Sequence, residues 1–378
     1  MTSTGSSPSR ILRVQPEERA PAVRKQPVKT VRVMIVDDSL TVRTIFRRMV
    51  EGDQRMDVVA TASSAERAIA QLTSTQVDVI LLDLEMPGMG GLEALPSLLK
   101  ASGEAQILVV STLTDDGAEA TMAALSMGAA DTMLKPRPGG FNDDYRSQLL
   151  GKIRALGGAD PVEEENRKSE TEKKPVNAVG PVGKTPELVA VGASTGGIHA
   201  INLMLRNLPA DFMPPILITQ HLPASFVSVF ARQIEMVSAK RTLIAEDGTE
   251  ILPGTIAVAA GHGHMVIKRQ GDRLIARTSA EPARSGCMPS VDPMLTSVAE
   301  ATKGHALAVL LSGMGRDGLL GAQDLVEAGG TVFAQNAETC AVWGMPGAVA
   351  KAGLTSLVAP PEQLSEAIAG CVKLRANS

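Results

Sequence analysis

VRVMIVDD (residues 31–38) and DVILLDLE (residues 78–85) are the two stretches that decide the fold of the first half of the chain. Each is a short apolar run that ends in acidic residues, and a segment with the spacing of an amphipathic helix follows each. Three further runs continue the alternation: DVVATA (57–62), QILVVST (106–112) and ADTMLKP (130–136). Five strands alternating with helices predict a parallel (βα)5 sheet covered on both faces, in a domain that we place at residues 30–156.

Polar side chains collect at the carboxyl ends of these expected strands, which form the functional edge of an open parallel sheet. They are Asp37, Asp38, Asp83, Ser111 and Lys135. A single aspartate at a strand end is more often a helix N-cap, but five such positions together favour a site. Three carboxylates repel each other unless they hold a cation, and oxygen ligands in small number favour Mg²⁺. Asp83 could then accept a phosphoryl group, with Lys135 offsetting its charge and Ser111 bonding a phosphoryl oxygen.

The rest of the chain divides at a change of composition. Residues 1–29 are rich in Ser, Pro, Arg and Glu, which predicts a flexible tail. Residues 157–184 are charged and contain Pro and Gly, which predicts a linker. Residues 185–375 resume the alternation, with apolar runs such as LVAVG, PPILITQ, ALAVLLS and TVFAQ. We expect a second, doubly wound and mostly parallel α/β domain there, with a local hairpin near residues 256–278, where helices are missing.

The second domain contains a serine, a histidine and an aspartate at expected strand ends. Ser194 lies in GASTG, which fits the pattern G-x-S-x-G between a strand and a helix. His221 follows the run ILITQ, and Asp317 lies in a glycine-rich loop after ALAVLLS. A serine hydroxyl needs an imidazole to take its proton, and the imidazole needs a carboxylate to orient it. We therefore predict Ser194 as nucleophile, His221 as general base and Asp317 as its partner.

The same residues also allow interpretations other than the triad. Considered alone, His221 could be an ordinary hydrogen-bonded histidine, and Asp317 could be an aspartate in a turn. A rival triad would join Ser194 to His305 through Asp247 or Asp292, but His305 precedes its strand, at the opposite edge of a parallel sheet.

Two further features of this domain bear on its chemistry. The glycine-rich segments around Thr195 and Met314 could offer backbone N–H groups to an oxyanion. His262 and His264 form an H-x-H pair that invites a zinc site, but no third ligand stands at a convincing spacing. We therefore expect these two histidines to be a loop pair beside glycines.

Composition excludes several classes of function. The net charge is −4 and only eight residues are aromatic, which argues against nucleic-acid binding. The three cysteines cannot pair completely and form no C-x-x-C motif, which suits a reducing compartment. No apolar run approaches the roughly 18 residues that a membrane span needs. These features predict a cytoplasmic protein with no direct membrane insertion.

The first domain resembles response-regulator receiver domains through VDDS, LDLEMPGMGG, VVST and LKP, over about residues 31–156. The resemblance implies that Asp83 is the phosphoacceptor and that it binds Mg²⁺ together with Asp37 and Asp38. It also implies that Ser111 and Lys135 sense the phosphoryl group. The chain departs from the receiver pattern at two positions. Gly90 replaces a usual Asp, and Thr132 stands where an aromatic switch residue is common.

The second domain resembles the catalytic domain of the chemotaxis protein-glutamate methylesterases, the CheB family. The shared segments are VGASTGG, ITQHLPASF, PSVDPML, LLSGMGRDG and AQNAETCAVWGMP, in the family's order over residues 189–347. The chain departs from the family at Ala260 and Met288, where Pro and Arg are frequent.

The combined resemblance implies a phosphorylation-regulated serine hydrolase that needs no cofactor for ester hydrolysis. Its substrates would be glutamate methyl esters of chemoreceptors, releasing methanol, and also receptor glutamines, which it would deamidate. A chemotaxis histidine kinase would be the phosphodonor. A signalling adaptor without catalysis is the competing class, and intact Ser194, His221 and Asp317 argue against it.

Overall fold

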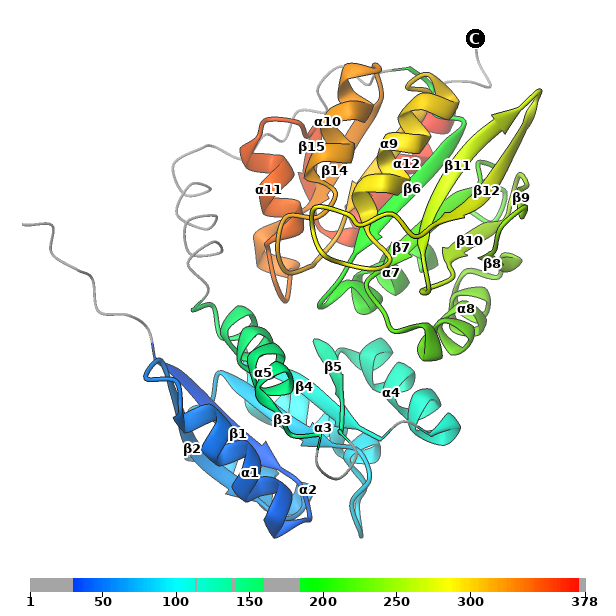
Figure 1. Cartoon of the computed structure of the whole chain (residues 1–378). Coiled ribbons are helices and arrows are strands. Elements are labelled where there is room, and N and C mark those ends of the chain that lie inside the picture. Colours follow the sequence, from blue (N-terminus) through cyan, green and yellow to red (C-terminus); the bar gives the residue numbers. More distant parts are fainter. Residues whose placement is uncertain (1–29, 113, 137–139, 160–183, 374–378) are drawn as a thin grey trace, which may run out of the picture.

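The computed structural model describes residues 30–112, 114–136, 140–159 and 184–373, and it contains two α/β domains (Figure 1). The expected tail at residues 1–29 lies outside the described residues, as does most of the expected linker at 157–184. Within the described part of the chain, no helix is both long and apolar enough to cross a membrane.

The N-terminal domain is a five-stranded parallel sheet in the order β2-β1-β3-β4-β5, as predicted. Its strands are β1 (Val31–Val36), β2 (Met56–Ala62), β3 (Val79–Asp83), β4 (Gln106–Ser111) and β5 (Asp131–Leu134). The helices are α1 (Leu40–Glu51), α2 (Ala65–Leu72), α3 (Gly91–Ser102), α4 (Asp115–Met127) and α5 (Asp143–Leu156). The central strand β3 is buried along its whole length, because helices pack on both faces of the sheet.

The C-terminal domain has a seven-stranded parallel sheet in the order β15-β14-β13-β6-β7-β10-β8. Its strands are β6 (Leu188–Ala193), β7 (Ile216–Gln220), β8 (Thr242–Ala245), β10 (Ile256–Ala259), β13 (Ala306–Leu310), β14 (Thr331–Gln335) and β15 (Leu357–Ala359). The helices are α7 (Gly197–Arg206), α8 (Ala224–Ser238), α9 (Val291–Thr302), α10 (Leu319–Glu327), α11 (Met345–Lys351) and α12 (Pro361–Lys373), with a 3₁₀ turn η1 (Ala337–Thr339). This arrangement confirms the predicted doubly wound sheet.

A small antiparallel sheet stands apart from the large one, in the order β11-β12-β9. It is made of β9 (Glu250–Ile251), β11 (His264–Gln270) and β12 (Arg273–Ser279). The expected hairpin is therefore present as β11 and β12. The strand β10 does not belong to it, because β10 pairs in parallel with β7 and β8 in the large sheet.

The two domains touch through α4, which packs against α7 and α8 (Figure 1). The N–H of Gly196 donates a hydrogen bond to the carbonyl of Ala130 at 2.5 Å. The ring Nδ1 of His199 lies 3.2 Å from the carbonyl oxygen of Ser126 in α4. The side chain of Gln233 in α8 also donates to Ser126 Oγ. The N-terminal domain thus reaches the turn that carries Ser194.

Candidate active site and phosphoryl site

Three carboxylates meet at the carboxyl edge of the N-terminal sheet. Asp37 and Asp38 follow β1, and Asp83 ends β3. One oxygen from each lies within 4.8 Å of the others; Asp37 and Asp83 are buried and Asp38 is exposed. Several carboxylate oxygens, with one side open to water, are the donor set that Mg²⁺ prefers. The residues present therefore fit the metal that the sequence led us to expect.

The amine of Lys135 lies over this acidic cluster. Its Nζ is 2.6 Å from Asp83 Oδ2 and 3.0 Å from Asp37 Oδ2. Burial raises the pKa of Asp83 to about 6, and the hydrogen bond from Lys135 opposes that rise. Ser111 ends β4 at the same edge, fully buried, and its Oγ accepts a hydrogen bond from Thr121 at 2.8 Å.

The two departures from the receiver pattern have visible structural effects. Gly90 is the N-cap residue of α3 and offers no side-chain cap. Thr132 is buried in β5, and its hydroxyl has no hydrogen-bond partner among the described residues. A small side chain thus occupies the position where receiver domains often have an aromatic residue.

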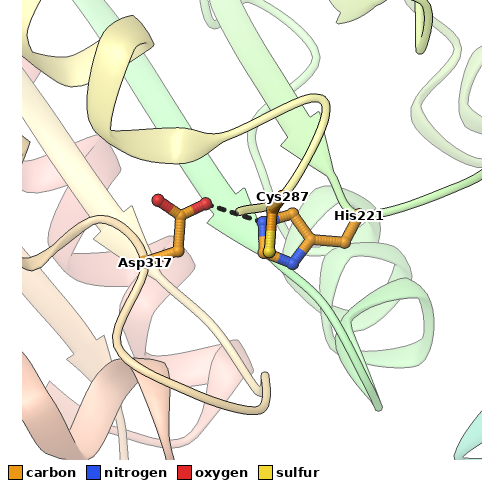
Figure 2. A group of neighbouring side chains, drawn as sticks. All are labelled: His221, Cys287 and Asp317. Carbon is orange, nitrogen blue, oxygen red and sulfur yellow. Dashed lines mark hydrogen bonds and ion pairs between the residues drawn. The ribbon is translucent and has the colours of Figure 1, made fainter. Parts of the chain in front are cut away.

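The serine, the histidine and the aspartate of the predicted triad follow three neighbouring strands. Ser194 follows β6, His221 follows β7, and Asp317 lies in the loop after β13. The Nε2–H of His221 donates to Asp317 Oδ2 at 2.7 Å (Figure 2). Gly196 adopts a left-handed φ of +77°, and a Cβ there would lie 2.5 Å from Ser312 Oγ. Only glycine therefore allows the turn that follows the serine.

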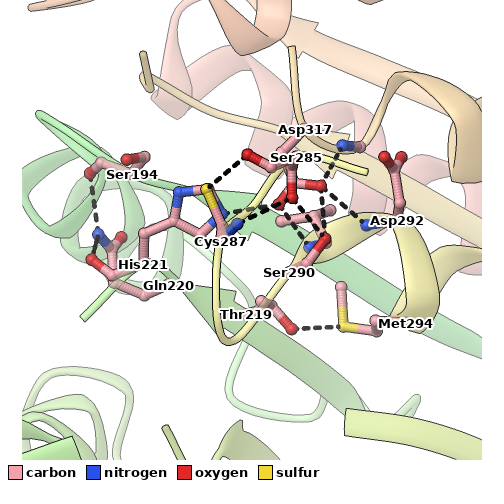
Figure 3. A network of polar contacts seen from close by, with 12 residues as sticks. Ser194, Thr219, Gln220, His221, Ser285, Cys287, Ser290, Asp292, Met294 and Asp317 are labelled. Carbon is pink, nitrogen blue, oxygen red and sulfur yellow. Dashed lines mark hydrogen bonds and ion pairs between the residues drawn. The ribbon is translucent and has the colours of Figure 1, made fainter. Parts of the chain in front are cut away.

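Ser194 shares a cavity with His221. Its backbone is fixed by two bonds, because its N–H donates to Ser312 at 3.0 Å and its carbonyl accepts from the Gln220 amide at 2.9 Å. A cavity of about 430 Å³ is lined by residues that include Ser194 and His221. Figure 3 shows the imidazole between Ser194 and Asp317. The described structure contains no hydrogen bond from Ser194 Oγ to the ring, so the hydroxyl has to turn toward Nδ1, as catalytic contacts often do only with substrate.

Asp317 is held rigidly as an anion. Its Oδ1 accepts from the Ser290 hydroxyl and its Oδ2 from the Val291 N–H, both at 2.7 Å. Longer bonds come from the N–H groups of Asp292 and Gly318. Burial alone would raise the pKa of Asp317, but the hydrogen bond from His221 and these other donors lower it to about 2.

The pKa of His221 is shifted by its hydrogen-bond partners as well. Burial would lower its pKa, but hydrogen bonds with Asp317 and Cys287 outweigh burial and raise the pKa of His221 to about 9. In this arrangement the ring is mostly protonated near pH 7. Deprotonation therefore has to precede any role as a general base.

The rival triad is not brought together. His305 lies before β13 and bonds the carbonyl of Thr185 at 3.3 Å. Asp247 pairs with Arg277 at 3.1 Å. Asp292 accepts the N–H of Gly321 at 2.9 Å.

The two histidines of the H-x-H pair lie in different environments. The prediction that both lie in a loop is wrong for His264. That residue is buried at the start of β11, where Nε2–H donates to Glu281 and Nδ1 accepts the N–H of Ser290 at 3.0 Å. Pairing with β12 holds His264 in a strand, although the neighbouring glycines favour a loop. His262 remains exposed, 3.5 Å from a carboxylate oxygen of Glu246.

Thr195 and Met314 remain predictions as oxyanion residues. Thr195 is buried, and its hydroxyl donates to Asp131 of the N-terminal domain. Met314 is 38% exposed in the loop before Asp317.

Sequence reasoning gave no role to four residues that contact the candidate triad or the turn that carries Ser194: Gln220, Cys287, Ser290 and Asp131. Gln220 precedes His221, and Ser290 belongs to the segment PSVD. Their spacing to the triad residues was visible, but the contacts depend on loops that only the folded chain defines. Cys287 carried no signal at all, because no other cysteine or histidine stands near it in the sequence.

Comparison with known families gives two matches along the chain. Residues 33–140 match the family described as "Response regulator receiver domain". Residues 189–368 match the family described as "CheB methylesterase".

Curated relatives match nearly the whole chain. One from Azospirillum brasilense, named protein-glutamate methylesterase/protein-glutamine glutaminase, is 39% identical over 88% of this chain and 91% of its own length. A second relative of this name, numbered 2, from Caulobacter vibrioides, is 42% identical over 89% of this chain and 98% of its own length. The crystal structure of the Thermotoga maritima CheB methylesterase catalytic domain is also similar. It is 34% identical with a TM-score of 0.47, covering 50% of this chain and 98% of that one.

Proposed function

Because the chain belongs to the CheB methylesterase family, we propose that it is a protein-glutamate methylesterase and protein-glutamine glutaminase under the control of its receiver domain. The observation that carries the proposal is the 2.7 Å bond between His221 and a buried, ionised Asp317 beside Ser194. The substrates would be glutamate methyl esters and glutamines on the cytoplasmic helices of chemoreceptors. The enzyme would act in the cytoplasm during chemotactic adaptation.

The proposed reaction passes through an acyl-enzyme. Ser194 Oγ attacks the ester carbonyl carbon while His221 Nδ1 takes the hydroxyl proton. The tetrahedral intermediate collapses, and His221 returns the proton to the leaving methoxide, which departs as methanol. Water, deprotonated by the same imidazole, then releases glutamate and restores Ser194. With a glutamine substrate, ammonia leaves in place of methanol.

The backbone N–H groups of Thr195 and Met314 are the oxyanion donors in this proposal. Thr195 follows Ser194 directly, and Met314 follows Gly313, which lies against Ser194. Such donors stabilise the charge that appears on the carbonyl oxygen. The carboxylate of Asp317 keeps the second ring nitrogen, Nε2, protonated, so that Nδ1 is the basic one.

The receiver domain is positioned to restrain this reaction. The cavity that contains Ser194 and His221 is also lined by receiver residues, among them Asp131 and Lys135. The carbonyl of Ala130 accepts a hydrogen bond from the N–H of Gly196, two residues after the serine. A receptor helix cannot reach Ser194 while the receiver occupies that space. We therefore propose that this arrangement, in which the receiver covers Ser194 (the closed arrangement), is the inhibited state.

Strand β5 links the phosphoryl site to this contact. Lys135, just past its end, bonds Asp83, and Asp131, its first residue, bonds Thr195. A phosphoryl group on Asp83, with Mg²⁺ held by Asp37, Asp38 and Asp83, would draw Lys135 to new oxygens. Ser111 at the end of β4 would donate to one of these oxygens. A chemotaxis histidine kinase would supply the group, and the resulting shift of β5 would weaken the domain contact.

Asp83→Asn should abolish stimulation by a small-molecule phosphodonor with Mg²⁺ while leaving basal methanol release unchanged. The amide cannot form the acyl phosphate, but it preserves the size of the side chain. Stimulated and basal methanol release from methylated receptor membranes would be compared. Asp57→Asn, at an exposed position on β2, is the control and should respond like the wild type. Normal stimulation of Asp83→Asn would assign phosphorylation to another residue.

Ser126→Arg should raise basal methanol release on the order of tenfold without any phosphodonor. Ser126 is half-buried in α4 and bonded to α7 and α8, and overpacking a contact costs about 1–3 kcal/mol. The control is Ser97→Arg on the exposed face of α3, which should not change the rate. Equal basal rates for both variants would refute the proposal that this contact inhibits the enzyme.

A further inference from the structure

A cysteine lies beside the catalytic pair. Cys287 Sγ, a ring nitrogen of His221 and a carboxylate oxygen of Asp317 all lie within 4.8 Å of one another (Figure 2). Thiolate, imidazole and carboxylate are the three side-chain ligand types of Zn²⁺. We propose that these residues form an inhibitory Zn²⁺ site, in which the metal replaces the proton between His221 and Asp317.

The geometry needs only small side-chain movements. Zinc bonds of about 2.0–2.3 Å place the ligand atoms of a tetrahedral site roughly 3.3–3.6 Å apart. The 2.7 Å separation of His221 Nε2 and Asp317 Oδ2 has to open slightly. Cys287 already interacts with His221, and its Sγ also makes a weak contact, 3.9 Å to the carbonyl of Ser285. Three protein ligands leave a fourth position for water.

The carboxylate ligand is already oriented by its neighbours. The Ser290 hydroxyl and the Val291 N–H hold Asp317 at 2.7 Å each. Ser290 is positioned in turn by its N–H bond to His264. Partners of this kind fix the direction of metal-binding carboxylates and strengthen binding.

The proposed site can be reached without opening the domain contact. Cys287 and Asp317 line a second cavity of about 210 Å³, together with Arg284, Asp292 and Arg316. None of the described residues that line it comes from the receiver domain. An ion could therefore enter from this side while the receiver still covers Ser194.

The proton balance explains why bound zinc would inhibit. A neutral imidazole carries one N–H, which in the triad is on Nε2 and leaves the Nδ1 lone pair free to accept the proton of Ser194. Zinc on Nε2 leaves a ring proton on Nδ1 alone, and both the proton displaced from Nε2 and the proton of the Cys287 thiol pass to water. The ring then has no lone pair for the serine. Inhibition, unlike binding, rests on the proposed esterase function.

The test is titration of the full chain with Zn²⁺ alone, followed by calorimetry, in millimolar Mg²⁺ to saturate the acidic site of the receiver. The wild type should bind one Zn²⁺ that Cys287→Ala binds about 100-fold more weakly or worse, since losing even an outer-shell partner costs 10–100-fold. Cys340→Ala, at a half-buried cysteine outside the cluster, should bind like the wild type. Co²⁺ should give a thiolate charge-transfer band that only Cys287→Ala lacks.

Methanol release measured in parallel completes the test. Zinc should inhibit the wild type and Cys340→Ala but not Cys287→Ala, and a chelator should restore the rate. Equal zinc binding by Cys287→Ala and wild type would overturn the site. Binding without inhibition of an active enzyme would overturn its inhibitory role. Cys287-dependent binding to a chain that releases no methanol would support the metal site and refute the esterase.

Discussion

Ser194→Ala is expected to reduce methanol release from methylated receptor membranes by about 10⁴-fold or more, because loss of a nucleophilic serine leaves only substrate binding and oxyanion stabilisation. The substitution removes one oxygen from the edge of a cavity of about 430 Å³ and keeps the backbone bonds of Ser194 to Ser312 and Gln220. The variant should therefore fold normally and accept a phosphoryl group on Asp83 at the wild-type rate.

Ser97→Ala is the matched control, since Ser97 is an exposed serine on α3. It should release methanol like the wild type. A Ser194→Ala variant with more than about a hundredth of the wild-type rate would refute a serine nucleophile, because substrate binding and oxyanion stabilisation alone support far less. A chemotaxis phenotype that survives a fully inactive Ser194→Ala would favour the adaptor over the enzyme.

Asp317→Asn is expected to lower the maximal rate by about 10⁴-fold, because an amide no longer holds the imidazole in its productive tautomer. It should also change the pH profile. The wild-type rate requires neutral His221, whose pKa is raised to about 9. The basal rate should therefore rise about tenfold per pH unit from pH 7, level off near pH 9, and fall as pH is lowered. Without the carboxylate, the inflection should move to lower pH.

Rate and pH profile would be measured with a chelator and no phosphodonor, so that only the unphosphorylated protein is followed. The control is Asp324→Asn, at an exposed carboxylate on α10 that bonds Thr296. Asp317 also accepts backbone N–H groups, so its amide variant should lose about 1–3 kcal/mol of stability, which thermal melting would detect. A folded Asp317→Asn with the wild-type inflection would remove Asp317 from the triad.

Much of the site follows from the sequence because parallel sheets bring strand ends to one edge. Ser194, His221 and Asp317 follow separate strands, and the order β13-β6-β7 makes those strands neighbours. The same reasoning collects Asp37, Asp83 and Lys135, whose contacts the structure shows. Apolar runs and their polar ends are local signals, so one sequence suffices to find them.

Other features depend on contacts that a sequence does not contain. An apolar run such as that of β10 does not reveal whether it pairs in parallel, so β10 was assigned to the hairpin. The edge strands β8 and β15 went unpredicted because they are short and only partly buried. The approach of Cys287 to His221 depends on the path of the loop before α9, which no periodicity encodes.

The contact between Ala130 and Gly196 has a consequence for how this protein changes over evolutionary time. Both partners are main-chain atoms, a carbonyl and an N–H. Substitution at position 130 alters neither hydrogen-bonding group, so this link between the domains survives sequence drift as long as the strand keeps its course. The side chain at position 130 can therefore change without loss of this hydrogen bond between the two domains.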